Sequence, residues 1–404
     1  MFKFDLLRFS GTGKYEKTTL ENIAKVTGGK RMPKGSSLIN EPNNHPYITV
    51  SNMNNNFEDL NTYQYVPTEI YSQIKNYIVD CDDLIISVAG TLGLVKKVPK
   101  CLDKANLTEN ANRISEIKID IDYLQYYLNT KIIQNRILAV QTNNAQPKLA
   151  LKEIRNFKIN YPPIEEQKKV SKFLSLIDSK IQLLEKKHEN YLNFKKYLMQ
   201  QIFAQKLRFA KFTDDWKNCK FKDLGTVKSG VGFSTKYQGH LDLEYNLYKV
   251  SDMNLKGNEK IMVKSNNTID DFILNEMNAK LITEPSIIFA KVGEAIFLNR
   301  KRIANKPFLI DNNMMAFTPN DKVNIDFMYY LSTTINFGKY AQTGALPSYN
   351  ASDINTIKCK IPSKEEQEKI ANILSLSDEK IDFYNDQLEK TKEFKKGLLQ
   401  QMFI

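Results

Sequence analysis

One short string in the sequence comes close to the motif of an adenine methyltransferase. That motif has a polar residue, two prolines and then an aromatic ring, which together hold a base that has been flipped out of the duplex. The nearest string is Asn160-Tyr161-Pro162-Pro163, in which the aromatic residue precedes the prolines. Because proline is favoured in the first turn of a helix, we interpret this string as a helix boundary and expect no methyl transfer there.

Other catalytic and metal-binding patterns are also out of context. A Glu-x-Lys pattern, as in nucleases, occurs at 185–187 and 393–395, but neither copy follows a Pro-Asp pair and both lie in helical stretches, so we interpret them as solvated charge. The histidines His45, His188 and His240 lack metal-ligand spacing, and the four cysteines form no CxxC pair. The sequence has no Gly-x4-Gly-Lys-Ser/Thr phosphate loop. We therefore expect no catalysis, metal or cofactor in this chain.

Composition is that of an ordinary globular chain with an excess of positive charge. The 404 residues, 42% of them hydrophobic, suffice for two to three domains with cores. No apolar run is long enough to cross a bilayer, and Lys3, Asp5 and Arg8 interrupt any signal-peptide pattern, so we expect a cytoplasmic protein. The net charge of +12, from 58 basic and 46 acidic residues, favours a polyanionic partner.

The chain is an internal duplication. Residues 162–203 align without a gap on 362–403, with 19 of 42 positions identical. Similar offsets pair residues of the preceding stretches, such as Gly90 with Gly293. A repeat of this length indicates two copies of one structural unit.

Each copy begins with a stretch of mixed secondary structure. Short apolar runs such as 84–88 are broken by clusters of Gly, Asn and Pro, which predicts strands joined by turns, and helices are expected near 119–138 and 324–338. We therefore predict a mixed α/β (α+β) fold with two homologous globular domains and two long helices. The predicted boundaries are 1–161 for the first globular domain, 162–206 for the first long helix, 207–361 for the second domain and 362–404 for the second helix.

After residues 162 and 362 the apolar residues follow a heptad pattern typical of coiled coils. The residues expected in the helix interface are Val170, Leu174, Ile177, Ile181, Leu184, Leu198, Ile370, Leu374, Ile381, Tyr384, Leu388 and Leu398. Polar residues at the same heptad positions, among them Lys195 and Lys395, either fix the register or mark where the supercoil ends.

Connectivity sets the direction of the two helices. Forty helical residues span about 60 Å, so the first helix would carry the chain away from the first domain before the second domain begins at Leu207-Arg208-Phe209. The second helix can bury its apolar stripe only by running back along the first. We therefore predict an antiparallel pair with pseudo two-fold symmetry and a globular domain at either end. Such a rod is suited to reading two separated half-sites on duplex DNA.

These features resemble the specificity subunit of type I restriction-modification enzymes over essentially the full length. The motifs that carry the resemblance are Pro-Pro or Pro-Ser before Glu-Glu-Gln (162–167, 362–367), Leu-Ser-Leu-x-Asp-x-Lys-Ile (174–181, 374–381), and Leu-Arg-Phe at 207–209 with Trp216 after it. The first copy departs from this pattern at Tyr15, where the second has Trp216.

The resemblance implies a non-catalytic DNA-binding subunit in which two target-recognition domains alternate with two helical repeats. Each domain would read one half of a bipartite, asymmetric DNA site, and the coiled coil would set the half-site spacing and recruit two modification subunits. Those subunits bind S-adenosylmethionine and methylate adenine. Further restriction subunits, which use ATP and Mg, cleave unmodified DNA.

Polar loops that occur in both copies supply the candidate DNA contacts, because Arg, Lys, Asn, Gln, Ser and Thr side chains reach phosphates and base edges. The candidates are Lys30, Arg31, Lys34, Ser51, Asn52, Asn54, Thr91, Asn143, Asn144, Gln146, Lys148, Lys228, Ser229, Ser234, Lys236, Ser251, Asn254, Lys291, Gln342, Thr343, Ser348 and Asn350. Solvated turns are an equally good interpretation of these loops, because Asn and Gly favour turns for backbone reasons alone.

Two other functions stay open at this point. The chain would fit a non-catalytic scaffold in which a coiled coil joins two protein-binding domains. It would also fit a fragment of a fused methyltransferase, although the catalytic motifs are missing.

Overall fold

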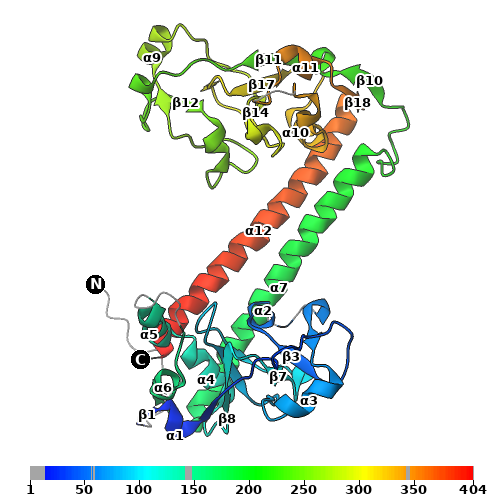
Figure 1. Ribbon diagram of the computed structural model, residues 1–404. Coiled ribbons are helices and arrows are strands. Elements are labelled where there is room, and N and C mark those ends of the chain that lie inside the picture. Colours follow the sequence, from blue (N-terminus) through cyan, green and yellow to red (C-terminus); the bar gives the residue numbers. More distant parts are fainter. Residues whose placement is uncertain (1–13, 56, 58–59, 142–147, 343–345, 404) are drawn as a thin grey trace. The chain divides into compact units, whose positions relative to one another are not determined.

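The computed structural model describes residues 14–55, 57, 60–141, 148–342 and 346–403. The chain divides into two units, one of Met1–Glu185 with Asp386–Ile404 and one of Lys186–Asn385. The long helices α7 (Ile164–Phe203) and α12 (Lys364–Met402) each contribute to both units (Figure 1). In the described part of the chain, no helix has the apolar length that spanning a bilayer requires.

The globular part of the first unit contains two main sheets. The four-stranded sheet has the order β2 (Lys25–Gly28), β8 (Ala111–Ser115), β5 (Leu84–Ser87), β6 (Val95–Lys97), and its neighbouring strands are antiparallel. The three-stranded sheet has the order β4 (Gln64–Tyr65), β3 (Pro46–Ile48), β7 (Asn106–Leu107). A separate pair joins β1 (Glu16–Thr19) to β9 (Lys158–Tyr161). The helices are α1 (Leu20–Ile23), α2 (Val50–Asn54), α3 (Thr68–Ile74), α4 (Ile121–Leu128), α5 (Lys131–Gln141) and α6 (Leu151–Arg155).

The second unit repeats this arrangement. Its sheets have the orders β11 (Gly225–Ser229), β17 (Met314–Pro319), β14 (Ser286–Ala290), β15 (Lys301–Ala304) and β13 (Thr268–Ile269), β12 (Tyr245–Tyr248), β16 (Phe308–Ile310), and β10 (Lys217–Lys220) pairs with β18 (Lys358–Ile361). The helices are α8 (Phe221–Leu224), α9 (Asp271–Glu276), α10 (Ile325–Thr334) and α11 (Ala351–Asn355). The equal strand orders confirm the duplication and the mixed fold class.

Strand β5 shows why its sequence is an unbroken apolar run. Successive side chains of a strand point to opposite faces of the sheet. Leu84 and Ile86 enter the core that packs against the long helices, whereas Ile85 enters a second core together with Ile48 and Met53. Because both faces are covered, every residue of the strand must be buried.

The two long helices run antiparallel within each unit, as predicted. As the residue number rises along one helix, that of its partner falls. The pairs are Asp178–Lys395 and Glu185–Lys392 in the first unit, and Tyr191–Tyr384 and Lys195–Asp378 in the second. The predicted interface residues are buried, except for Ile181 and Tyr384, which are half-buried.

The helices also complete the cores of the globular parts. Leu174 of α7 and Leu398 of α12 lie in the main core of the first unit, and Leu198 and Leu374 take the same places in the second. Each globular part is therefore fixed to the helix pair by shared apolar burial, which is worth about 25 cal/mol per Å² of apolar surface.

The Gln of the repeated Glu-Glu-Gln motif makes a second, polar attachment. Gln167 Oε1 accepts a hydrogen bond from the backbone N–H of Asp120 at 2.8 Å, and Gln367 Oε1 accepts one from that of Asn324 at 2.9 Å. Asp120 and Asn324 are the N-cap residues of α4 and α10, because their side chains accept from the backbone N–H three residues on. One glutamine thus holds the start of a domain helix against the start of a long helix in each unit.

A half-buried polar cluster recurs where the helices cross the domain surface. In the first unit Asp178 accepts a hydrogen bond from Tyr126 Oη at 2.7 Å and pairs with Lys395, whose Nζ lies 5.3 Å from the Tyr126 ring centroid. Burial, and then the hydrogen bond to Asp178, raise the pKa of Tyr126. The tyrosine therefore stays a neutral donor to the carboxylate.

The second unit builds the same cluster from Asp378, Lys195 and Tyr330. Tyr330 Oη donates to Asp378, and Lys195 Nζ pairs with that carboxylate and lies 5.3 Å from the Tyr330 ring centroid. The polar heptad residues Lys195 and Lys395 therefore have partners in the seam, which favours their interpretation as residues that fix the register.

Candidate nucleic-acid interface

The first group of predicted DNA contacts lies on the loop that leaves β2. Lys30, Arg31 and Lys34 are exposed, and Arg31 Nε donates to Glu109 Oε1 at 2.6 Å. Gly29 lets the chain pass close to the neighbouring strand, because a Cβ there would lie 2.0 Å from the backbone oxygen of Thr108. The loop therefore carries three exposed cations, and one of them, Arg31, is paired with Glu109.

The equivalent loop of the second unit begins at a matching glycine. A Cβ on Gly230 would lie 1.8 Å from the backbone oxygen of Asp311. Lys228, at the end of β11, is half-buried and pairs with Glu284 at 3.0 Å. The other predicted residues of this loop, all exposed, are Ser229, Ser234 and Lys236. Both copies therefore begin a polar loop at the point of close strand approach.

Asn52 corrects the second group of predictions. It is 3% exposed, and its Oδ1 accepts hydrogen bonds from the backbone N–H and the hydroxyl of Thr49, which completes the capping box of α2. Because the amide oxygen of this buried side chain already accepts the bonds of a helix cap, it is not available to a DNA base. The neighbouring predicted residues are exposed, namely Ser51 and Asn54 on α2, and Ser251 and Asn254 on the 3₁₀ turn η4 (Val250–Asn254).

The third group lies on the hairpin loops that follow β5 and β14. Thr91 is exposed on the shorter loop, and Lys291 is half-buried at the start of the longer one. The structure adds Arg300, which the sequence analysis missed. Its Nη1 donates to Asn254 Oδ1, so two loops that are distant in the sequence meet in the second unit. No repeated sequence pattern signals this contact, because the strand registers place Leu94 at the equivalent position of the first copy.

The last group precedes α6 and α11. Lys148 is exposed in the first unit. In the second unit Gln342 and Asn350 are exposed and Ser348 is half-buried, and Asn350 Oδ1 accepts from the backbone N–H of Asp353 as the N-cap of α11. The predicted contacts Asn143, Asn144, Gln146 and Thr343 lie outside the described residues.

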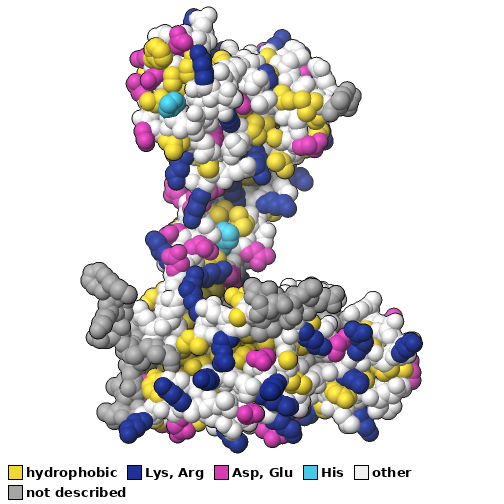
Figure 2. Space-filling model, turned by 60° about the vertical axis from the view of Figure 1, so that its left-hand side comes forward, with side chains coloured by type: hydrophobic (Ala, Val, Ile, Leu, Met, Phe, Trp, Pro, Cys, Tyr) yellow, Lys and Arg dark blue, Asp and Glu magenta, His cyan; other side chains and the backbone are white. Residues whose placement is uncertain are grey.

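On the face shown in Figure 2, Lys and Arg side chains are spread over both globular parts, with Asp and Glu side chains among them. Several predicted cations pair with carboxylates, as Lys236 does with Glu276 at 3.7 Å. Exposed pairs of this kind contribute little to stability because water and salt screen them, so a phosphate can replace the carboxylate at little cost.

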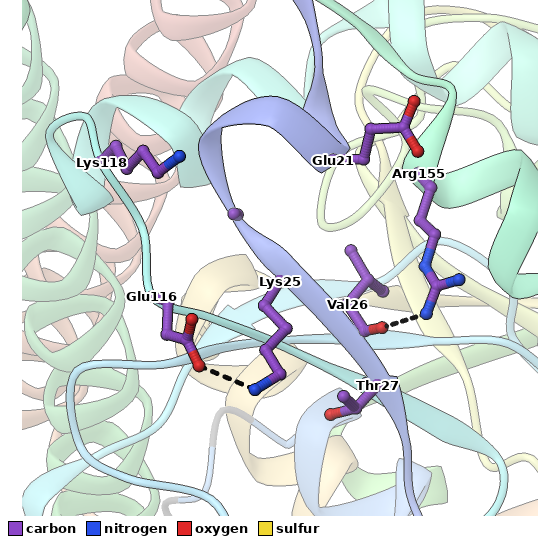
Figure 3. Close-up of a pocket in the computed structure, with 8 residues that line it drawn as sticks. Glu21, Lys25, Val26, Thr27, Glu116, Lys118 and Arg155 are labelled. Atoms are coloured by element: carbon purple, nitrogen blue, oxygen red, sulfur yellow. Dashed lines mark hydrogen bonds and ion pairs between the residues drawn. The ribbon is translucent and has the colours of Figure 1, made fainter.

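A shallow pocket of about 410 Å³ beside β2 is lined by charged residues but is not arranged for catalysis (Figure 3). Lys25 Nζ donates to Glu116 Oε1 at 2.9 Å, and Arg155 Nη2 donates to the backbone oxygen of Val26 at 2.9 Å. Two of the pocket's cations are thus already hydrogen-bonded to other groups of the pocket. Elsewhere in the described ranges, no group of three or more His, Cys, Asp and Glu side chains is placed to bind a metal ion.

Comparison with known proteins gives one family over most of the chain. A model described as the type I restriction modification DNA specificity domain matches residues 13–193 and again 213–393. The type I restriction enzyme MjaVIII specificity subunit of Methanocaldococcus jannaschii is 23% identical over 347 residues, which cover 80% of this chain and 79% of that protein. The MjaIX specificity subunit of the same organism is 23% identical over 411 residues, covering 95% and 91%.

A solved structure agrees on the fold. The crystal structure of the type I restriction-modification system S subunit from M. genitalium superposes with a TM-score of 0.61 over 99% of both chains, at 16% sequence identity. The two matched segments coincide with the two structural repeats, each of which brings polar loops and one long helix. The chain therefore belongs to the type I restriction-modification specificity subunits, carries two copies of their DNA specificity domain, and is a non-catalytic subunit of such enzymes.

Proposed function

We propose that each globular part, within 1–161 and 207–361, reads one half of a bipartite DNA site. The observation that carries this proposal is one fold present twice with different loops. The hairpin loop between β5 and β6 covers residues 88–94, whereas that between β14 and β15 covers 291–300. Because base contacts are made by loop side chains, two domains with different loops would read different sequences, and the whole site would be asymmetric.

The long helices would set the distance between the half-sites. Each is a continuous helix, of 40 residues in α7 and 39 in α12, and each contributes to the cores of both units. A helix of this length spans about 60 Å and resists bending, particularly when paired with a second helix. The helix length would then determine the number of unread base pairs between the half-sites.

Apolar side chains on the outside of the helices would bind the modification subunits. Leu176 and Leu183 of α7 are 61% and 54% exposed. Their equivalents in the repeat, Leu376 and Phe383 of α12, are 58% and 54% exposed. Exposed apolar groups that recur at the same helical positions indicate a binding surface rather than chance. We call these the outer stripes.

Each outer stripe includes one residue from the opposite helix. Phe394, 55% exposed, belongs to the first unit, and Phe194, 49% exposed, to the second. Leu176 and Leu183 share one heptad position on α7, and Phe394 has another on α12. On a single helix these two heptad positions would lie about 40° apart around the axis, at 100° per residue. In an antiparallel pair these flanks face the same side, so each unit would offer one apolar groove to a partner helix. Two grooves would take two modification subunits.

The remaining chemistry would belong to the partners. The modification subunits would bind S-adenosylmethionine, and restriction subunits would use ATP and Mg. Since the proposed substrate is genomic DNA, the assembled complex would work in the cytoplasm.

Methylation mapping tests the proposal. The chain, assembled with its modification subunits, should methylate adenines in one bipartite sequence. Exchanging residues 20–150 for those of a relative should change one half of that sequence and leave the other half and the spacer unchanged. A change in both halves, or in neither, would contradict the assignment of one half-site to each domain.

The scaffold alternative predicts a different response to salt. A DNA-reading chain that neutralises several phosphates should lose affinity steeply between low and moderate salt, with a slope of about −0.9 per phosphate contact. A protein scaffold with no DNA function would show no such slope. The net charge of +12 favours the first outcome.

A further inference from the structure

The hairpin between β14 and β15 carries two exposed apolar residues that its counterpart lacks. Phe297 and Leu298 are 54% and 58% exposed. The loop of the first copy is three residues shorter, and its large apolar residues Val88, Leu92 and Leu94 are buried or half-buried against the cores. An exposed Phe-Leu pair on one copy alone is therefore not required by the fold.

The pair is held on a rigid tip. Ile296, directly before it, is buried, and Asn299, directly after it, adopts a left-handed backbone conformation with φ of 51°. The Asn299 side chain accepts hydrogen bonds from the backbone N–H of Phe337 at 3.0 Å and from Lys301 Nζ. The two exposed side chains thus project from a turn that is fixed on both sides, which lowers the entropy cost of inserting them into a partner.

A neighbouring loop extends the apolar tip. The backbone N–H of Gly293 donates to the backbone oxygen of Pro347 at 2.8 Å, and a bridge joins Val292 to Ser348. Beside this attachment Leu346 is 62% exposed, and a Cβ on Gly293 would lie 3.8 Å from its Cδ1. The exposed apolar surface therefore belongs to two loops that are fastened together.

Cations flank this tip. Within the loop 291–300, Arg300 is exposed and Lys291 is half-buried, and the one carboxylate is Glu294. Exposed Lys339 follows Gly338, where a Cβ would lie 3.1 Å from the Phe297 ring. Arg300 also contacts Asn254 on η4, one of the predicted DNA-contacting residues. Duplex DNA has an apolar stack of bases between two rows of phosphates. The apolar side chains of the tip would contact the bases, and the cations around it would contact the phosphates.

We propose that Phe297 and Leu298 form a wedge that inserts between two base pairs of the half-site read by the second domain. The inference rests on the proposed function. Insertion of Phe or Leu partly unstacks a base step and kinks the duplex, which makes recognition depend on how easily that step deforms. The matching hairpin of the first domain, residues 88–94, carries no exposed apolar pair, so this hairpin wedge would distort only the half-site of the second domain.

Fluorescence of 2-aminopurine tests the wedge, because this base brightens when it is unstacked. The probe is placed in turn at each position of both half-sites, except the methylated adenine, in complexes that contain the modification subunits but no methyl donor. We expect a several-fold rise at one step of the second half-site. The double variant Phe297→Ala/Leu298→Ala should lose the rise and bind at least tenfold more weakly.

Two control variants keep the test specific. Phe272→Ala removes another exposed ring of the same unit, 69% exposed on α9, and should retain both signal and affinity. Phe297→Tyr/Leu298→Met keeps the bulk of the tip and should retain the rise. The wedge is refuted if the wild-type complex binds its site without any rise, if the alanine variant keeps the rise, or if that variant loses its modification subunits instead. Absence of sequence-specific binding by the wild type would refute the proposed function as well.

Discussion

Lys395 near the end of α12 forms an ion pair with Asp178 of α7. The repeat builds the reciprocal pair from Lys195 of α7 and Asp378 of α12. Each long helix thus supplies one anion and one cation, and each anion also accepts a hydrogen bond from a tyrosine of a globular part. A shift of one helix along the other would break both pairs, so this arrangement selects one register.

Asp178→Asn should destabilise the first unit by about 1–2 kcal/mol, because it leaves a half-buried lysine without its counter-charge. Chemical denaturation would measure the loss. Asp178→Asn/Lys395→Met should recover most of it, because no unpaired charge then stays in the seam.

A solvent-exposed pair of α12 supplies the control for this measurement. Asp386 and Lys390 lie one turn apart at 2.7 Å, with side chains 54% and 69% exposed. Asp386→Asn should cost no more than about 0.5 kcal/mol. Equal losses at positions 178 and 386 would contradict a special role for the seam pair.

Charges introduced into one outer stripe should remove one partner. Leu176→Glu/Leu183→Glu should yield a complex with a single modification subunit, and Leu376→Glu/Phe383→Glu should do the same at the other stripe, because a carboxylate cannot be buried against an apolar helix without a partner. Native mass spectrometry would count the subunits. Leu241→Glu, at a residue 63% exposed outside the helices, should leave both bound. Full complexes from both double variants would refute the stripes.

Removal of one heptad from both helices should shorten the spacer of the DNA site. Deleting 185–191 with 384–390 removes segments that lie opposite each other and keeps every outer-stripe residue. Seven residues amount to about 10 Å of helix, or about three base pairs. Methylation mapping should then give the same two half-sites at the smaller separation. Deleting 185–191 alone should destroy the register, and an unchanged spacer in the double deletion would disprove the role of the helices.

Lys301 should make the stability of the second unit depend on pH. It is 1% exposed, and burial lowers its pKa to about 7. Between that value and the pKa of about 10.4 in the unfolded chain, only the unfolded chain holds the proton. Unfolding free energy should therefore rise with pH in this window, by up to about 1.4 kcal/mol per pH unit.

Lys301→Met should remove this dependence. Its stability relative to the wild type should be greatest at pH 7 and below, and should decline towards pH 10. Denaturant midpoints measured from pH 6.5 to 9.5 would show the two slopes, and parallel slopes would mean that Lys301 does not titrate in this range.

The long helices could be predicted from the sequence because the burial of one apolar stripe determines both their period and their pairing. Residues such as Leu174 and Leu374 recur with the period of a helix, and both are fully buried. The first helix ends shortly before Leu207-Arg208-Phe209, where the second domain begins. The second helix can therefore bury its stripe on the first helix only by running antiparallel to it. The strand orders, in contrast, join residues such as Lys25 and Ser115 that no local pattern relates.

The candidate site was harder to predict because loop side chains have several uses. Asn52 fits a DNA contact by type, yet the chain uses it to cap α2. The signal was present, since Thr49 lies three residues before it, as a capping box requires. Arg300 could not have been found, because its contact with Asn254 depends on how two loops fold together.

The two glutamines at the helix starts have a consequence for how such proteins diversify. Gln167 and Gln367 bind main-chain atoms only: the backbone N–H of Asp120 or Asn324, directly before α4 or α10, and the backbone oxygen of Pro162 or Pro362, just before the long helix. Every residue type except proline offers that N–H, so this hydrogen bond does not depend on which side chain the bound residue carries. An exchanged domain would therefore keep this polar contact whatever its own sequence at the helix start. Only the side chains that pack on Leu174 and Leu398, and the tyrosine that donates to Asp178, would have to match the helices.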